Sequence, residues 1–259
     1  MDALQYALGG GSGVLVGFTL GLVGGGGSVL AVPLIVYLVG VKNPHIAIGT
    51  SAFAVAVNAG LGLLQHARVH NVNWRCGGLY AVAGVFGALL GSSVGKAFNG
   101  QKLLFLFALV MLAVGVVMLR RRGDAGHANV LCSIDRMPKV SGFGFVTGLF
   151  AGFFGIGGGF LIVPGLVAST GMSILTAVGT SLVAVTAFGL TTAVNYAFSG
   201  LINWPLALVF ILGGMVGSFI GSKAARRLAD TRGLLNTVFS VLIFVVAFYM
   251  LYRSVLVWG

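Results

Sequence analysis

The sequence predicts an all-α membrane protein that crosses the bilayer several times. Hydrophobic residues make up 58% of the 259-residue chain and charged residues only 7%, whereas a soluble globular protein carries about 25% charged residues. Apolar runs of roughly the ~20 residues that a spanning helix needs recur along the chain. The two halves of the chain also repeat the same short motifs. Together these observations predict about eight hydrophobic segments in two inverted repeats of four.

The apolar runs are hydrophobic on all faces, unlike the one-sided helices of soluble proteins. They lie at about 12–40, 46–65, 77–98, 103–119, 141–169, 175–198, 205–222 and 234–252. One long polar connection separates the fourth run from the fifth. We therefore expect a first transmembrane repeat at 1–119, a basic linker at 120–140 and a second transmembrane repeat at 141–259.

Four motifs of the first half return in the second half, in the same order and at a nearly constant offset. The longest, "GFTLGLVGGGGSVLAVPL" at 17–34, parallels "GLFAGFFGIGGGFLIVPG" at 148–165. The other three pairs are "AIGTSAFA" (47–54) with "AVGTSLVA" (177–184), "VNW" (72–74) with "INW" (202–204), and "GVFGALLGS" (84–92) with "GMVGSFIGS" (214–222). Offsets of 130 or 131 residues throughout indicate a duplication.

The Lys and Arg residues between the segments indicate how the halves are oriented. If every segment spans once, the two sides carry eight and seven basic residues, which defines no cytoplasmic side. If segments one and five enter, break and return, each half crosses three times and the halves are inverted. The sides then carry eleven and four basic residues, the four being Lys42, Lys96, Lys102 and Arg253. This asymmetry predicts a cytoplasmic linker at 120–140.

The glycine-rich stretches of segments one and five are the predicted breaks. Glycine is costly inside a helix, and a broken helix survives at membrane depth only where protein or a watery cavity satisfies the freed backbone. Paired interruptions in two repeats point to a transporter's binding site. The alternative is close helix packing through small residues. The breaks are predicted at Gly24, Gly25, Gly26 and Gly27, followed by Pro33, and at Gly155, Gly157, Gly158 and Gly159, followed by Pro164.

The residues near the breaks suit an anion. A broken helix presents unpaired N–H groups and the positive end of its dipole, where oxyanions bind readily, and Ser28 adds a hydroxyl donor. The second and sixth segments add further candidate substrate ligands, for which hydrogen bonding between helices is the alternative role. These candidates are Thr50, Ser51, Asn58 and Gln65 in the first half and Thr180, Ser181 and Asn195 in the second.

The apolar segments contain no Asp or Glu. This disfavours metal-cation transport and an enzyme, and we expect no metal site and no cofactor. Coupling stays open between a titrating His45, His66 or His70, a Na⁺ ion at the helix breaks, and simple downhill movement of the anion. The basic residues lie between apolar runs, which indicates topology signals and not nucleic-acid binding. Cys76 and Cys132 lack metal-type spacing, and we expect free thiols.

"GLVGGGGSVLAVPLI" and "GFFGIGGGFLIVPGL", each followed by "GTS", resemble the sulfite exporter TauE/SafE family over nearly the whole chain. Ile156 and Gly159 stand where the first half has Gly25 and Ser28. The resemblance implies a carrier in the bacterial inner membrane that exports a small organosulfur or sulfur oxyanion, such as sulfite, sulfoacetate or another sulfonate. Its partners would be that small anion and the lipid bilayer. The alternatives are an anion channel of the same fold and a carrier of a neutral amino acid such as cysteine or taurine.

Overall fold

A computed structural model describes residues 2–120, 137–155, 159–228, 241 and 243–253, and its elements are helices, as predicted. The first half holds α1 (Ala3–Val23), η1 (Gly24–Leu30), α2 (Ala31–Pro33), η2 (Leu34–Leu38), α3 (Pro44–Arg68), α4 (Trp74–Ala97) and α5 (Gly100–Arg120). The second holds α6 (Met137–Phe154), α7 (Gly159–Thr170), α8 (Ile174–Ala197), α9 (Trp204–Leu228) and the helix Ile243–Arg253. Five of them, α1, α3, α4, α8 and α9, are long and apolar enough to cross a membrane.

The first segment breaks at Gly24 and returns. Gly24 ends α1 with φ 68° and ψ −141°, a conformation that favours glycine. The chain continues as the 3₁₀ helix η1 and then as α2 and η2. The Gln5 side chain, in the first turn of α1, donates a hydrogen bond of 3.2 Å to the carbonyl of Val39, just beyond η2. The chain has therefore come back to the end of the molecule where α1 began.

The first helix begins earlier than the apolar run that starts at about 12. Glycines at 9–11 and 13 lower the hydrophobicity of this stretch, so the sequence pattern missed its helical start. In the structure these glycines allow close packing, because a side chain on Gly13 would collide with the backbone of Phe210 in α9. The contact between helices thus accounts for a glycine-rich turn that intrinsic helix preference disfavours.

The fifth segment has the same course. α6 ends at Phe154, and Gly155 follows with φ 66°. Residues 156–158 lie outside the described part, and α7 begins at Gly159. A Cβ atom on Gly165 of α7 would lie 3.4 Å from Cγ2 of Thr147, in the middle of α6, so α7 runs back along α6.

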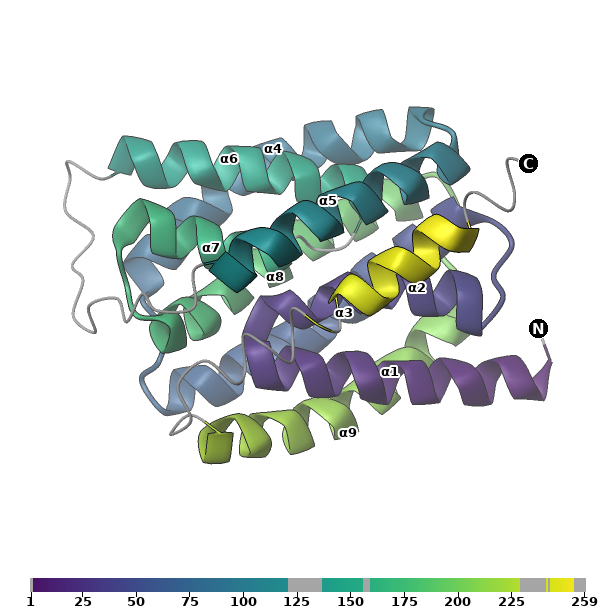
Figure 1. Cartoon of the computed structure of the whole chain (residues 1–259), viewed down its shortest axis with the longest axis horizontal. Coiled ribbons are helices and arrows are strands. Elements are labelled where there is room, and N and C mark those ends of the chain that lie inside the picture. The colour runs from purple at the N-terminus through teal and green to yellow at the C-terminus, as the bar shows by residue number, and fades with distance from the viewer. Residues whose placement is uncertain (1, 121–136, 156–158, 229–240, 242, 254–259) are drawn as a thin grey trace.

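Two glycine-lined helix pairs form opposite edges of the molecule, α1 beside α9 and α4 beside α6 (Figure 1). Within each pair the helices run in the same direction, since successive turns meet in order. Gly17 touches the backbone of Gly214 in the first pair, and Gly148 touches that of Gly84 in the second. These four residues occupy equivalent positions in the repeated motifs, so the halves exchange matching contacts.

An equivalent pair of hydrogen bonds between the two halves holds the helix ends in place. The backbone N–H of Asn203 donates to Oγ1 of Thr50 at 2.9 Å, and the N–H of Asn73 donates to Oγ1 of Thr180 at 3.0 Å. Each asparagine also caps the helix that follows it, with Oδ1 accepting from the N–H of Leu206 or Cys76. α3 and α8 are thereby fixed against the starts of α9 and α4.

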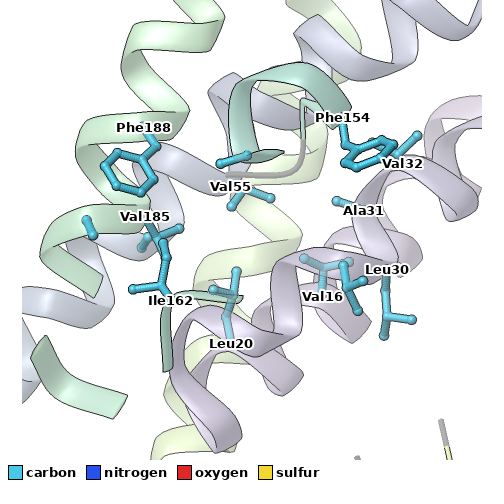
Figure 2. Close-up of a cluster of buried hydrophobic side chains, with 14 of the residues drawn as sticks. Val16, Leu20, Leu30, Ala31, Val32, Val55, Phe154, Ile162, Val185 and Phe188 are labelled. Carbon is cyan, nitrogen blue, oxygen red and sulfur yellow. The ribbon is translucent and has the colours of Figure 1, made fainter. Parts of the chain in front are cut away.

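The core lies where both broken segments meet α3 and α8. Figure 2 shows Val16, Leu20, Leu30, Ala31 and Val32 of the first broken segment near Phe154 and Ile162 of the second, with Val55 from α3 and Val185 and Phe188 from α8. All are buried. The two breaks are therefore enclosed by protein, which is the condition for irregular backbone inside a membrane.

The two ends of the molecule carry different basic residues. We call the lysine end the one with Lys42 and Lys96, where the side chain of His45 contacts the carbonyl of Phe98 and α9 begins. The arginine end holds Arg68 and Arg75, beside the bond between Asn73 and Thr180. Arg253 lies over the ring of Tyr37, near the lysine end. The predicted linker falls mostly on residues 121–136, outside the described residues.

Candidate functional site

The two glycine breaks meet each other inside the molecule. A Cβ atom on Gly159 would collide with the carbonyl group of Gly25, so the two backbones are in direct contact. Gly24 lies against Val178 of α8, and Gly155 lies against Ile48 of α3. Val178 and Ile48 are equivalent in the two motifs, 130 residues apart. Each break thus rests on the central helix of the other half.

Side-chain hydroxyls form hydrogen bonds with backbone groups at the first break. The N–H of Gly25 donates to Oγ of Ser181 at 3.3 Å, and Oγ of Ser28 donates to the carbonyl of Gly25 at 2.9 Å. Ser181 Oγ donates in turn to the carbonyl of Val178 at 2.7 Å. Gly25, Ser28 and Ser181 are all buried. The sequence-predicted residues Gly25, Ser28, Gly159 and Ser181 are therefore brought together.

The remaining residues of the first break lie close by. Gly26 belongs to η1, and Gly27 packs against Thr19 and Leu20 of α1. Ser51, the counterpart of Ser181, donates to the carbonyl of Ile48 at 2.9 Å and so lies on the side facing Gly155. Pro33 is buried in α2 and Pro164 lies inside α7. Gly157 and Gly158, which the sequence also predicts at the second break, lie outside the described residues.

The other predicted ligands are spread along the helices. Residues seven apart share a helix face but lie about 10 Å apart along its axis, so Ser51 and Gln65 are separated by about 21 Å. Asn195 lies at the lysine end, where Oδ1 accepts from Nζ of Lys96 at 2.8 Å. One small anion cannot touch all of these residues at once.

Asn58 lies near the middle of α3 and is 1% exposed. Its amide packs on Gly214, where a Cβ atom would collide with it. Neither Oδ1 nor Nδ2 has a hydrogen-bond partner among the residues that the structure describes. Burying such a group without a partner costs about 1–3 kcal/mol, and Asn58 shares this condition with the hydroxyls of Ser12, Thr192 and Tyr196 among the described residues.

A cavity of about 280 Å³ opens between α3 and α9 at the arginine end. Its polar lining consists of Gln65, Arg68 and Ser218, and its apolar lining includes Leu61 and Phe219. Sequence reasoning missed Ser218, although a serine four residues after Gly214 in an apolar run was a usable signal. Arg68 is one of the basic residues between apolar runs, which the sequence analysis interprets as topology signals.

Sequence reasoning also missed the bonds that Lys96 makes at the lysine end. Its Nζ donates to the carbonyl and Oδ1 of Asn195 and, at 2.9 Å, to Oγ of Ser199. Asn195 donates to Oγ of Ser92 at 2.6 Å and to Oγ of Ser93 at 3.1 Å. Because these bonds join α4 to α8, they tie the two halves together at this end.

Two further expectations concern groups that bind metals. The described residues contain no cluster of three His, Cys, Asp or Glu side chains. Cys76 is buried and disulfide-bonded, so the expectation of a free thiol is wrong for this residue. Cys132 lies outside the described residues. The polar groups gathered at the breaks are hydroxyls and peptide groups, which can donate to an anion.

Comparison with known proteins finds relatives that match most of the chain. The profile of the family described as Sulfite exporter TauE/SafE matches residues 10–250. A probable membrane transporter protein of Xylella fastidiosa strain Temecula1 is 52% identical over 245 residues, covering 94% of each chain. The probable membrane transporter protein YunE of Bacillus subtilis is 25% identical over 237 residues, covering 83% of this chain and 87% of its own. No solved structure matches the chain.

These relatives are named as transporters, which makes an enzyme unlikely and, with the apolar helices, supports a multi-pass membrane protein that transports a solute. The resemblance read from the glycine motifs is confirmed by a match that spans both halves. The chain belongs to the sulfite exporter TauE/SafE family.

Proposed function

We propose that this protein is a secondary carrier that exports a small sulfur oxyanion, such as sulfite, sulfoacetate or another sulfonate, across the bacterial inner membrane. The observation that carries the proposal is the contact between the two broken segments, with the Gly25 N–H bound by Ser181 of the other half. Paired interruptions at a repeat interface are where transporters bind their substrates.

The chemistry of this meeting point supports an anion. Its polar groups are backbone N–H groups and the hydroxyls of Ser28, Ser51 and Ser181, and the described membrane segments contain no Asp or Glu. In this structure these donors bond within the protein, and a bound oxyanion would accept hydrogen bonds from them in place of those internal bonds. The family description supplies the sulfur oxyanion as the substrate class.

Alternating access would follow from two inverted repeats. The matching exchanges of Thr50 with Asn203 and of Thr180 with Asn73 support a duplicated scaffold whose halves can rock against each other. On this proposal the two broken segments return toward the ends where α1 and α6 begin, so that each half crosses the membrane an odd number of times and the halves are inverted. We assign the arginine end and the linker 120–140 to the cytoplasm by the positive-inside rule.

Export needs no coupling ion on this proposal. The free energy of a monovalent anion falls by about 2.3 kcal/mol per 100 mV when the anion leaves a cell whose interior is negative. Collapsing the membrane potential should therefore slow the efflux of sulfite from loaded right-side-out vesicles. An efflux rate that depends on Na⁺ or on the pH gradient, and is indifferent to the potential, would favour a coupled carrier.

The direct test is the melting temperature of the purified protein with sulfite, sulfoacetate, taurine, sulfate, thiosulfate and cysteine, each in Na⁺ and in K⁺. We expect stabilisation by sulfite or a sulfonate, and its loss in Ser181→Ala. Ser169→Ala is the matched control, because Ser169 is equally buried and also donates to its own helix. Stabilisation by cysteine alone, or by no anion, would contradict the proposal.

A further inference from the structure

We infer that the substrate anion travels between the arginine end and the centre along α3 and α9, and that Asn58 is its deepest polar contact on this route. The inference rests on the proposed function and deepens it. We call the route the α3–α9 path and define it by Arg68, Gln65, Ser218 and Asn58. The first three of these residues line the cavity, and Asn58 lies one helical turn beyond it.

The cavity provides the outer part of the path. Arg68 lies at the last residue of α3, and Gln65 and Leu61 follow at successive turns toward the centre. Ser218 faces them from α9 and is 2% exposed. The lining thus passes from a guanidinium group through an amide to a buried hydroxyl, all of which can donate hydrogen bonds to an oxyanion.

Asn58 continues this series inward. It lies three residues from Leu61 on α3, and Gly214 beneath it lies four residues from Ser218 on α9, so one helical turn separates Asn58 from the cavity lining. Its amide is buried and has no partner among the described residues. An amide that donates from Nδ2 to a passing anion would gain the bond that it lacks here.

The equivalent place in the other half is closed. The counterpart of Asn58 is Phe188, whose ring fills the space over Gly84. Ala88 stands where the α3–α9 path has Ser218, and Asn195, the counterpart of Gln65, is held by Lys96. The structure therefore has a cavity on the arginine side, while Phe188 fills the equivalent place on the lysine side, and this difference is the one expected of a single state of an alternating-access carrier.

Accessibility of a cysteine tests the path without knowledge of the natural substrate. In a background with Cys76 and Cys132 replaced by serine, Ser218→Cys should react with a small anionic methanethiosulfonate that carries a sulfonate. Ala88→Cys is the matched control at the equivalent buried position. We expect Ser218→Cys to react at least about ten-fold faster, because Ser218 lines the cavity whereas Ala88 packs against Gly152 of α6, and a thiol that the reagent cannot reach is inert. Equal rates at the two positions would overturn the inference.

The role of Arg68 is tested by the charge of the reagent. Relative to a free thiol in solution, the anionic reagent should modify Ser218→Cys faster than a cationic reagent of the same size. Arg68→Gln should reduce this preference by about two- to five-fold, because the charge at the mouth concentrates anions. A preference that survives in Arg68→Gln would show that the path does not select anions in this way.

Asn58→Leu separates binding from folding. Leucine has the same branching as asparagine, and an apolar group in place of an unpartnered amide should leave the melting temperature equal or higher. Stabilisation by sulfoacetate or sulfite should weaken by about ten-fold in ligand concentration, the size expected for one hydrogen bond to a charged group. Asn58→Ala provides a second test should leucine be too large over Gly214.

The outcomes distinguish this inference from the proposed function. If the wild type is stabilised by an anion and Asn58→Leu responds identically, the path is wrong and the carrier proposal stands. If no anion stabilises the wild type while Ser218→Cys still reacts, the proposed function is contradicted although the reagent enters the α3–α9 path. Loss of anion stabilisation in Asn58→Leu, together with rapid labelling of Ser218→Cys, is the result that we expect.

Discussion

The α3–α9 path and the corresponding region between α8 and α4 are built from equivalent helices, but their side chains fill the space between the helices differently. The residues of the first, Asn58, Gln65 and Ser218, have Phe188, Asn195 and Ala88 as counterparts 130 residues on. The first region contains a cavity, and in the second an aromatic ring covers Gly84 and Lys96 binds Asn195. The comparison teaches that the repeated motifs give both regions the same scaffold, while a few side-chain differences determine how the space between the helices is filled.

The largest effect should come from the point where both regions converge. Gly159→Ala places a methyl group on the carbonyl of Gly25, and the backbone cannot yield as a side chain could. We expect a loss of at least about 3 kcal/mol in stability, in the range of severe overpacking, and loss of transport. Thermal unfolding of the purified variant measures this.

Gly78→Ala is the control for that substitution. Nothing lies within 4 Å of a Cβ atom on Gly78, inside α4. Alanine should therefore be neutral or stabilise the helix by up to about 1 kcal/mol. Equal melting temperatures for the two variants would show that the contact between the breaks is not close packed.

The second effect tests what closes the lysine end. Phe188→Ala removes a fully buried ring from above Gly84 and should cost about 3–4 kcal/mol. The cavity that it leaves should also let the anionic thiol reagent reach Ala88→Cys, which erases the difference between the two regions. If Ala88→Cys stays unreactive in the Phe188→Ala background, the ring is not the barrier.

A smaller effect is expected from the bonds of Lys96. Lys96→Met removes two hydrogen bonds from α4 to Asn195 of α8 and one to Ser199, just beyond α8. Because Lys96 is only partly buried, we expect about 1–2 kcal/mol of destabilisation. We also expect the thiol reagent to label Ala88→Cys faster from the lysine end. Lys102→Met, an exposed lysine at the same end, should change neither quantity. Equal effects of the two substitutions would argue against a lock at Lys96.

The smallest effect tests the shared scaffold. Thr50→Val and Thr180→Val each remove one hydroxyl that accepts a backbone N–H across the halves. Each should cost about 1 kcal/mol, and the two values should agree within about 0.5 kcal/mol, because the contacts are equivalent. Melting temperatures that differ widely would show that the halves do not share one design.

Composition and repeats were sufficient to predict the helical class, the breaks at Gly24 and Gly155, and the family. The start of α1 could not be predicted, because a helix with several glycines near Gly13 is stabilised by its packing on α9, which the local sequence does not reveal. The roles of Thr50 and Thr180 as braces depend on Asn203 and Asn73, more than 100 residues away. Such distant contacts leave no local pattern.

The structure separates the predicted site residues into groups that sequence spacing alone does not distinguish. Seven-residue spacing placed Ser51, Asn58 and Gln65 on one face, but helical rise separates them by about 10 Å at each step. The same periodicity could not reveal that Asn195 bonds to Lys96. Gly25, Gly159, Ser28 and Ser181 do lie close together in the described part of the chain, because the repeated motifs themselves carry them.

The most direct test of the carrier is counterflow in proteoliposomes, with sulfite or sulfoacetate chosen by its effect on the melting temperature. Liposomes loaded with unlabelled anion should transiently accumulate the labelled anion, with saturable rates, and Asn58→Leu should reduce the rate by about ten-fold. Resolvable single-channel currents without counterflow, or counterflow as fast in Asn58→Leu as in the wild type, would contradict a carrier whose substrate passes along the α3–α9 path.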